Sequence, residues 1–183
     1  TKHPLDFELG ASENSSTAKS LLERLIRRGF SPAPGCRLYT VLDGASALKT
    51  AVLSYFPDAE FQRCLVHKER NLRGYMRRSE YAELSGHFDR LRKAQGEAAG
   101  REALSGLERF LCGRNAAALE SLREAGEELI CLHRLNVPST LNSSLLSTNL
   151  IENPFRNVRR KTSRVCRWRR DTEQASRWLA MAL

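Results

Sequence analysis

The sequence has no long hydrophobic run and little methionine or cysteine. No apolar stretch in its 183 residues approaches the roughly 20 residues that a transmembrane helix needs, so we expect no membrane partner. Residues 1–9 lack the apolar core of a signal peptide, and the chain starts with Thr1 rather than Met. Two Met and five Cys exclude a disulfide-dense secreted scaffold. An odd number of irregularly spaced cysteines is typical of reduced thiols, so we expect a cytoplasmic protein.

Acidic residues are scarce in two parts of the chain. The whole sequence carries 30 Lys and Arg against 21 Asp and Glu, a net charge of +9. Residues 63–95 hold nine basic and four acidic side chains, and residues 153–183 hold nine and two. The stretch between them, residues 96–152, is net acidic. Such asymmetry indicates a polyanionic partner, most often nucleic acid.

The first part of the chain has the pattern of an α/β unit. Alternating or continuous apolar residues predict strands at residues 5–9, 38–42 and 61–66. Helical spacing of apolar residues predicts helices at 18–26 and 48–56. The resulting order of strand, helix, strand, helix, strand is typical of a layered sheet with covering helices.

The pattern changes after His67. Residues 68–138 show helical spacing of apolar residues and no strand signal, and Pro138 closes this block. A polar loop and a basic helical tail follow. We therefore divide the chain into a partial core at 1–67, a helical insertion at 68–138 and a C-terminal part at 139–183.

Two carboxylates are candidates for chemistry. Asp43 ends the central strand just before Gly44, where α/β folds bind ligands, but an Asp-Gly pair is also a common turn former. Glu152 follows Asn149 by three positions, which is also the spacing of a capping box. In the functional interpretation, Asp43 and Glu152 are hard oxygen ligands for Mg²⁺.

An ordered set of motifs resembles the core of Mutator-type bacterial insertion-sequence transposases. The resemblance covers nearly the whole chain. The motifs are Gly10-Ala11-Ser12-Glu13-Asn14, the stretches 41–48 and 61–71, Leu135-Asn136-Val137-Pro138, the stretch 147–153, Arg159-Arg160-Lys161-Thr162 and Arg177-Trp178-Leu179-Ala180.

The resemblance implies a ribonuclease-H-like core, a mixed sheet with flanking helices, that carries an all-helical insertion before the last catalytic helix. It implies a DNA transposase with a DDE triad that binds Mg²⁺ or Mn²⁺ and performs DNA cleavage and strand transfer. Asp43 would be the second carboxylate and Glu152 the third, with the first Asp expected upstream of residues 10–14, before Thr1. The partners would be transposon ends and target DNA, bound by a homodimer at the bacterial nucleoid.

An alternative is a catalytically inactive DNA-binding relic of a transposase, which keeps the fold and the basic faces but lacks the first Asp. Pro154 also bears on activity. A proline inside a helix costs roughly 3 kcal/mol and would tilt Glu152 out of register with Asp43.

The basic tail is the candidate DNA-binding surface, with a merely solvated charged face as the alternative. On one continuous helix, residues 156, 160, 164 and 167 share a face that suits a phosphate backbone. Trp168 would stack on an unpaired base or simply pack. The tail residues are Arg156, Arg159, Arg160, Lys161, Arg164, Arg167, Arg169 and Arg170; an earlier block comprises Arg63, Lys68, Arg70, Arg73, Arg77 and Arg78.

A Cys64-x-x-His67 pair, which recurs in the family at the same place, has a spacing that permits zinc. Two ligands do not make a tetrahedral site, so Cys131 and His133 would have to complete it. In the alternative interpretation, Cys64 is a small buried residue and His67 caps a helix or lines the active site.

Overall fold

The computed structural model describes residues 3–8, 14–165, 167–169 and 172–182. Strands β1 (Tyr39–Leu42) and β2 (Glu60–Arg63) pair in parallel, with Tyr39 opposite Glu60 and Leu42 opposite Arg63. Helix α2 (Ser46–Tyr55) connects them, as a parallel pair requires, and the three elements form a βαβ unit.

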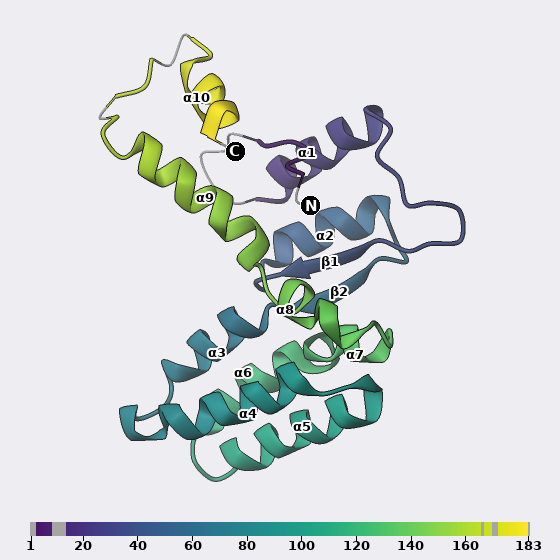
Figure 1. Cartoon of the computed structure of the whole chain (residues 1–183), viewed down its shortest axis with the longest axis vertical. Coiled ribbons are helices and arrows are strands. Elements are labelled where there is room, and N and C mark those ends of the chain that lie inside the picture. The colour runs from purple at the N-terminus through teal and green to yellow at the C-terminus, as the bar shows by residue number, and fades with distance from the viewer. Residues whose placement is uncertain (1–2, 9–13, 166, 170–171, 183) are drawn as a thin grey trace.

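Helix α2 covers one face of this small sheet, and α1 (Ser15–Arg27) packs against α2, as Figure 1 shows. Helix α1 starts at Ser15 because the side chain of Asn14 accepts a hydrogen bond of 2.9 Å from the backbone N–H of Thr17. Leu22 of α1 packs with Ala51 and Val52 of α2, so the two helices and the sheet share a small core.

The other face of the sheet packs against a helical block. Its shared core contains Phe88 and a set of fully buried leucines, so this block is the larger hydrophobic unit. Its elements are α3 (Leu65–Arg73), η1 (Arg78–Glu80), α4 (Tyr81–Lys93), α5 (Gly96–Leu111), α6 (Ala116–Ala125), η2 (Gly126–Leu129) and α7 (Cys131–Arg134).

The side-chain amide of Gln62 joins the helical block to β2 through hydrogen bonds. The amide is fully buried; its Nε2 donates to the carbonyl of Leu129 at 3.0 Å, and its Oε1 accepts from the N–H of Leu132 at 3.0 Å. A buried amide satisfied on both sides holds two surfaces in one register, because displacement would leave polar atoms unpaired.

The chain then returns to the sheet through η3 (Ser139–Leu141) and α8 (Asn142–Leu145). The N–H of Leu65 donates to the carbonyl of Leu146 at 3.0 Å, which places the end of this return beside the start of α3. Helix α9 (Asn149–Thr162) extends away from the sheet, and α10 (Gln174–Ala182) packs beside it (Figure 1). No helix of the described residues is long and apolar enough to span a membrane.

The strands predicted at 38–42 and 61–66 are confirmed as β1 and β2, but β2 ends at Arg63 because α3 begins at Leu65. Residues 68–138, all of which the structure describes, contain helices and no strand. The predicted strand at 5–9 is wrong over residues 5–8. There, Arg24 of α1 binds Asp6 at 2.6 Å and the carbonyl of Phe7 at 2.6 Å, so the segment lies on a helix rather than in a sheet. Leu9 and residues 10–13 lie outside the described part.

Candidate active site and nucleic-acid interface

Asp43 lies directly after β1, exposed at the carboxyl end of the strand. Its Oδ1 accepts a hydrogen bond of 3.1 Å from the N–H of Ala45, so Asp43 does form the turn expected of an Asp-Gly pair. Within the described residues it makes no ion pair. Its second carboxylate oxygen therefore stays available for a ligand.

The turn after Asp43 rests on the side chain of Arg63. Gly44 has φ +118°, and a Cβ there would lie 2.2 Å from Nη1 of Arg63. The guanidinium is 11% exposed and binds Glu124 at 2.8 Å and Glu128 at 3.1 Å. Burial alone would lower the pKa of Arg63, but the two carboxylates outweigh it and raise that pKa. Glycine at position 44 thus allows a buried cation to lie beneath the Asp43 turn.

Glu152 lies in the first part of α9 and contacts two side chains. The hydroxyl of Thr148 donates to its Oε1 at 2.9 Å, and Nε2 of His67 lies 3.8 Å from the same oxygen. The predicted capping box is wrong, because the helix begins at Asn149 and Thr148 is the N-cap, without a side-chain capping bond. The carboxylate of Glu152 therefore faces His67 and Thr148 instead of capping its own helix.

Cys64 links this cluster to the core. Its side chain is fully buried, and its Sγ accepts a hydrogen bond of 3.3 Å from the N–H of Thr148. Nδ1 of His67 lies 3.3 Å from the same sulfur and 3.1 Å from the hydroxyl of Thr148. The Cys-x-x-His motif therefore places a histidine against the start of α9.

The prediction that Cys131 and His133 complete a zinc site with Cys64 and His67 is wrong. Cys131 donates to Glu60 at 3.6 Å, and Nε2 of His133 lies 2.9 Å from the carbonyl of Leu91, so both are engaged elsewhere. Among the residues that the structure describes, no three His, Cys, Asp or Glu side chains are grouped as metal ligands. Zinc binding by Cys64 and His67 alone stays a prediction.

Asp43 and His67 line the same open pocket, about 390 Å³ in volume. Glu152 does not line it but lies with its Oε1 3.8 Å from Nε2 of His67, so His67 borders both the Asp43 pocket and Glu152. The remaining lining residues come from the Asp43 turn, α3, α6 and the end of β2; they are Gly44, Ala45, Arg63, Lys68, Asn71, Ser121 and Glu124.

The carboxylates around the pocket divide into two kinds. Glu124 binds Arg63 and also Lys68 at 3.1 Å, and Glu128 binds Arg63 and Lys49. These acids are already neutralised by the protein. In the described part of the chain, neither Asp43 nor Glu152 forms an ion pair with a lysine or arginine, so their negative charge is free to bind a cation.

Three arginines of the predicted DNA-binding set lie on the Glu152 side of α9. Arg156, Arg159 and Arg160 follow Glu152 by four, seven and eight positions, which places them on its helix face. All three are exposed, and none forms an ion pair with a residue that the structure describes. Lys161, by contrast, turns to α10, where its Nζ donates to the carbonyl of Met181 at 3.3 Å.

The prediction that this helix face continues to residues 164 and 167 is wrong. Helix α9 ends at Thr162, where the hydroxyls of Thr162 and Ser163 donate to backbone carbonyls of the preceding turn at 2.9 and 3.1 Å. Such back-bonding competes with helix continuation. Arg164, Arg167 and Arg169 lie in the segment between α9 and α10, and Arg170 and Cys166 lie outside the described residues.

The earlier basic block also contains two kinds of residue, those in ion pairs and those exposed without one. Arg63 and Lys68 are buried in ion pairs with Glu124, and Arg73 binds Glu69 at 2.6 Å. Arg70, Arg77 and Arg78 are exposed and form no ion pair within the described residues. Only the second group presents charge to a partner.

Pro154 does not interrupt α9, which is continuous from Asn149 to Thr162. Proline removes one backbone donor, but Glu152 precedes it, so the turn that carries the carboxylate keeps its own bonds. The N–H of Glu152 donates to the carbonyl of Thr148 at 3.1 Å. Sequence reasoning had given no role to Thr148, although it lies inside the motif at 147–153.

Comparison with known proteins identifies the class to which this fold and site belong. The family described as "Transposase, Mutator family" matches residues 1–183, and the chain belongs to this family. The predicted resemblance is confirmed.

Curated relatives agree with this assignment. The transposase for insertion sequence element IS1201 of Lactobacillus helveticus is 27% identical over 157 residues, 86% of this chain and 41% of the relative. The transposase for insertion sequence element IS905 of Lactococcus lactis is 28% identical over 166 residues, 89% and 40%. The transposase for IST2 of Acidithiobacillus ferrooxidans is 26% identical over 155 residues, 85% and 51%. The chain thus spans about half or less of the length of each relative.

Proposed function

We propose that this chain is the catalytic part of a DDE-type DNA transposase, which performs metal-dependent cleavage and strand transfer in the transposition of an insertion sequence. The observation that carries the proposal is that His67 contacts Glu152 and lines the same pocket as Asp43. Asp43 directly follows strand β1, and Glu152 lies on α9, which follows the helical block in the sequence. They are also the carboxylates near the pocket that no lysine or arginine neutralises.

The proposed fold class is a ribonuclease-H-like core with an all-helical insertion. The parallel pair β1 and β2 with α2 would be part of the mixed sheet. Helices between β2 and α9 would form the insertion, with domains at 1–67, 68–138 and 139–183. This order supports the proposal because the insertion separates Asp43 from Glu152 in sequence, while the return through α8 places the start of α9 beside the start of α3.

The donor atoms suit Mg²⁺ or Mn²⁺, which prefer carboxylate oxygens. When bound, such an ion would supply Lewis-acid stabilisation of the charge that develops on phosphate oxygens. Asp43 and Glu152 would hold it, and the third carboxylate implied by the family resemblance would come from upstream sequence.

The protein's own groups would position the DNA. Arg156, Arg159 and Arg160 offer positive charge in a row that begins at Glu152, so a phosphate backbone along α9 would lead into the site. Thr148 and His67 would orient the carboxylate of Glu152. Transposon ends and target DNA are the proposed partners, with a homodimer assembled on paired ends at the bacterial nucleoid.

The test is nicking of supercoiled plasmid in the presence and absence of Mn²⁺, by this chain and by the same chain extended upstream. Asp43→Asn and Glu152→Gln should each abolish Mn²⁺-dependent nicking while leaving DNA binding intact. Asp58→Asn, at an exposed loop position without an ion pair in the described structure, is the matched control and should nick normally. Salt-sensitive binding with no nicking, indifferent to Mn²⁺ and to these variants, would instead identify an inactive relic.

A further inference from the structure

Both tryptophans of the chain meet on one surface, although neither belongs to the proposed active site. Trp168 lies in the segment after α9, and Trp178 lies on α10. Their ring centroids are 6.5 Å apart and the ring planes are inclined at 73°, an edge-to-face contact. Trp168 is 38% and Trp178 is 43% exposed, whereas tryptophan is on average highly buried. An edge-to-face contact also leaves flat ring surface uncovered by the partner ring.

Hydrogen bonds between side chains and backbone connect the segments that carry the pair. The N–H of Arg169 donates to Oε1 of Gln174 at 3.2 Å, and the hydroxyl of Thr172 donates to the carbonyl of Arg169 at 3.3 Å. The bond from Lys161 to Met181 joins α10 to α9. These bonds connect the segment of Trp168 with the start of α10, and α10 with α9, so the two rings come from segments that are bonded to each other.

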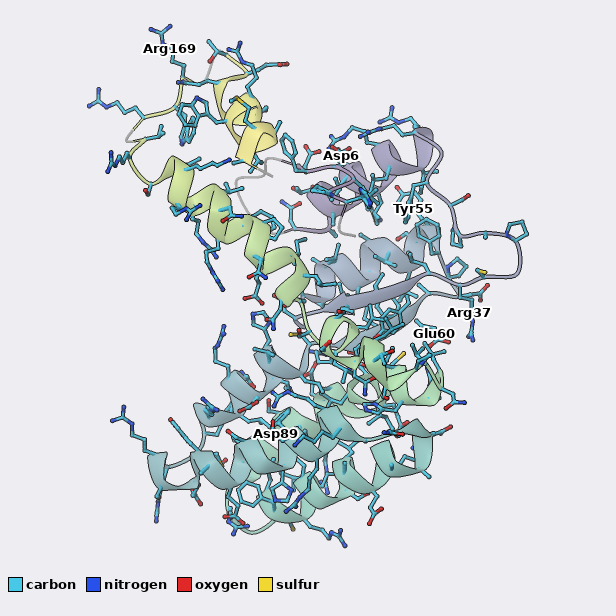
Figure 2. All side chains as sticks on the ribbon, viewed as in Figure 1. Asp6, Arg37, Tyr55, Glu60, Asp89 and Arg169 are labelled. Atoms are coloured by element: carbon cyan, nitrogen blue, oxygen red, sulfur yellow. The ribbon has the colours of Figure 1, made fainter. Side chains whose placement is uncertain are left out.

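The charge around the pair is predominantly positive. Arg167, Arg169 and Arg177 adjoin the two tryptophans in sequence, are exposed and form no ion pair with described residues. Two acids, Asp171 and Glu173, lie between the tryptophans in sequence; Asp171 lies outside the described residues, and Glu173 forms no ion pair with these arginines. Figure 2 shows Arg169 at the end of the molecule beyond α9. An apolar aromatic surface within cationic side chains suits a ligand that is flat, apolar on its faces and anionic along its backbone.

We propose that Trp168 and Trp178 form a stacking site for unpaired bases of single-stranded DNA, with the flanking arginines contacting its phosphates. Every base has a π-face, so such a site binds without sequence preference. The inference rests on the proposed function in that the chain acts on DNA. It adds a separate contact for the unpaired strand, away from the duplex track on α9.

Because these are the two tryptophans of the chain, tryptophan fluorescence, excited at a wavelength that its four tyrosines do not absorb, reports on this site. The test titrates the protein with oligothymidine and with an abasic strand of the same length, which carries the same phosphates and no bases. Oligothymidine should quench the fluorescence and bind about five- to 150-fold more tightly per stacked base than the abasic strand. Equal affinities without quenching would overturn the proposal. This comparison uses the unmodified protein and so does not depend on the folding of a variant.

Variants separate stacking from charge. Trp168→Leu should reduce the preference for oligothymidine over the abasic strand, and Trp168→Tyr should retain most of it. Duplex affinity, measured by anisotropy of a labelled duplex, should change less than about twofold in both. Arg169→Gln should instead weaken both single strands alike, with a salt slope lower by about 0.7.

Two further outcomes keep this inference distinct from the proposed function. Asp43→Asn should lose nicking and keep the quenching, and a protein that nicks DNA without discriminating bases would retain the proposed function and refute the stacking site. Quenching by phosphatidylserine vesicles but not by oligothymidine would overturn the proposal and assign the pair to a lipid surface.

Discussion

The backbone N–H of Thr148 donates a hydrogen bond of 3.3 Å to the sulfur of Cys64, a residue 84 positions earlier in the chain. Cys64 is the N-cap of α3 and Thr148 is the N-cap of α9, so this contact joins the starts of the helices that carry His67 and Glu152. Cys64 is fully buried. This hydrogen bond to a buried side chain therefore fixes the position of His67 relative to Glu152.

Replacement of Thr148 by Val should remove a hydrogen bond that orients the carboxylate of Glu152. The substitution keeps the side-chain shape and the backbone bond to Cys64, but it removes the hydroxyl that donates to Glu152 at 2.9 Å. We expect a loss of about 1 kcal/mol in the free energy of unfolding, measured by urea denaturation, together with reduced nicking. Thr148→Ser keeps the donor and should restore both. A Val variant with unchanged stability and nicking would show that this hydroxyl does not position Glu152.

Replacement of Gly44 by Ala should displace the Asp43 turn. The added Cβ would lie 2.2 Å from Nη1 of Arg63, and φ +118° is strained for any residue with a Cβ. Gly35→Ala is the control, because its φ is +77° and a Cβ there meets nothing within 4 Å. We expect Gly44→Ala to lower the unfolding free energy by about 1–3 kcal/mol, and by more than Gly35→Ala does. Equal losses would mean that Arg63 does not constrain the turn.

Stability should fall as the pH falls below about 6.5, partly because of His133. Burial lowers the pKa of His133, and its bond to the carbonyl of Leu91 offsets this only in part. The unfolded chain then binds a proton that the folded chain does not, so acid favours unfolding. Burial also lowers the pKa of His87, which acts in the same direction. His133→Gln should flatten the pH dependence of the urea midpoint in part, with the exposed His3→Gln as the control.

Arginines of α9 should contribute to duplex binding through phosphate contacts. Arg156→Gln and Arg159→Gln should each reduce the slope of log K against log salt by about 0.9, because each removes one phosphate contact. Arg123→Gln removes an exposed charge on α6, in the helical block, and serves as the control. Unchanged slopes in the α9 variants would place the duplex on another surface.

Local patterns determined much of this protein. The continuous apolar run at 38–42 became β1, helical spacing in 68–138 became a helical block, and Asp43 lies at the strand end where the sequence placed it. Apolar periodicity specifies such elements because it reflects which side of a short segment is buried. The ordered motifs likewise determined the family, which the comparisons confirm.

Predictions from local sequence patterns were wrong where a contact with a residue distant in the sequence determined the local structure. Alternation at 5–9 predicts a strand, but Asp6 and Phe7 bind Arg24 instead. The spacing of Asn149 and Glu152 predicts a capping box, but the carboxylate turns to His67 and Thr148. In each case a contact from a separate element outweighed a weak local preference.

Tertiary structure alone decided which basic side chains form buried ion pairs within the protein and which are exposed to solvent. Arg63 and Lys68 look like Arg70 and Arg78 in the sequence, yet only the first two are buried in ion pairs with Glu124. It also decided that His67 lines a pocket with Asp43 and contacts Glu152. The ion pairs depend on the position of α6, and the contact between His67 and Glu152 depends on the return of the chain through α8 to the buried Cys64. Burial between segments that are distant in sequence leaves no periodic trace in either segment.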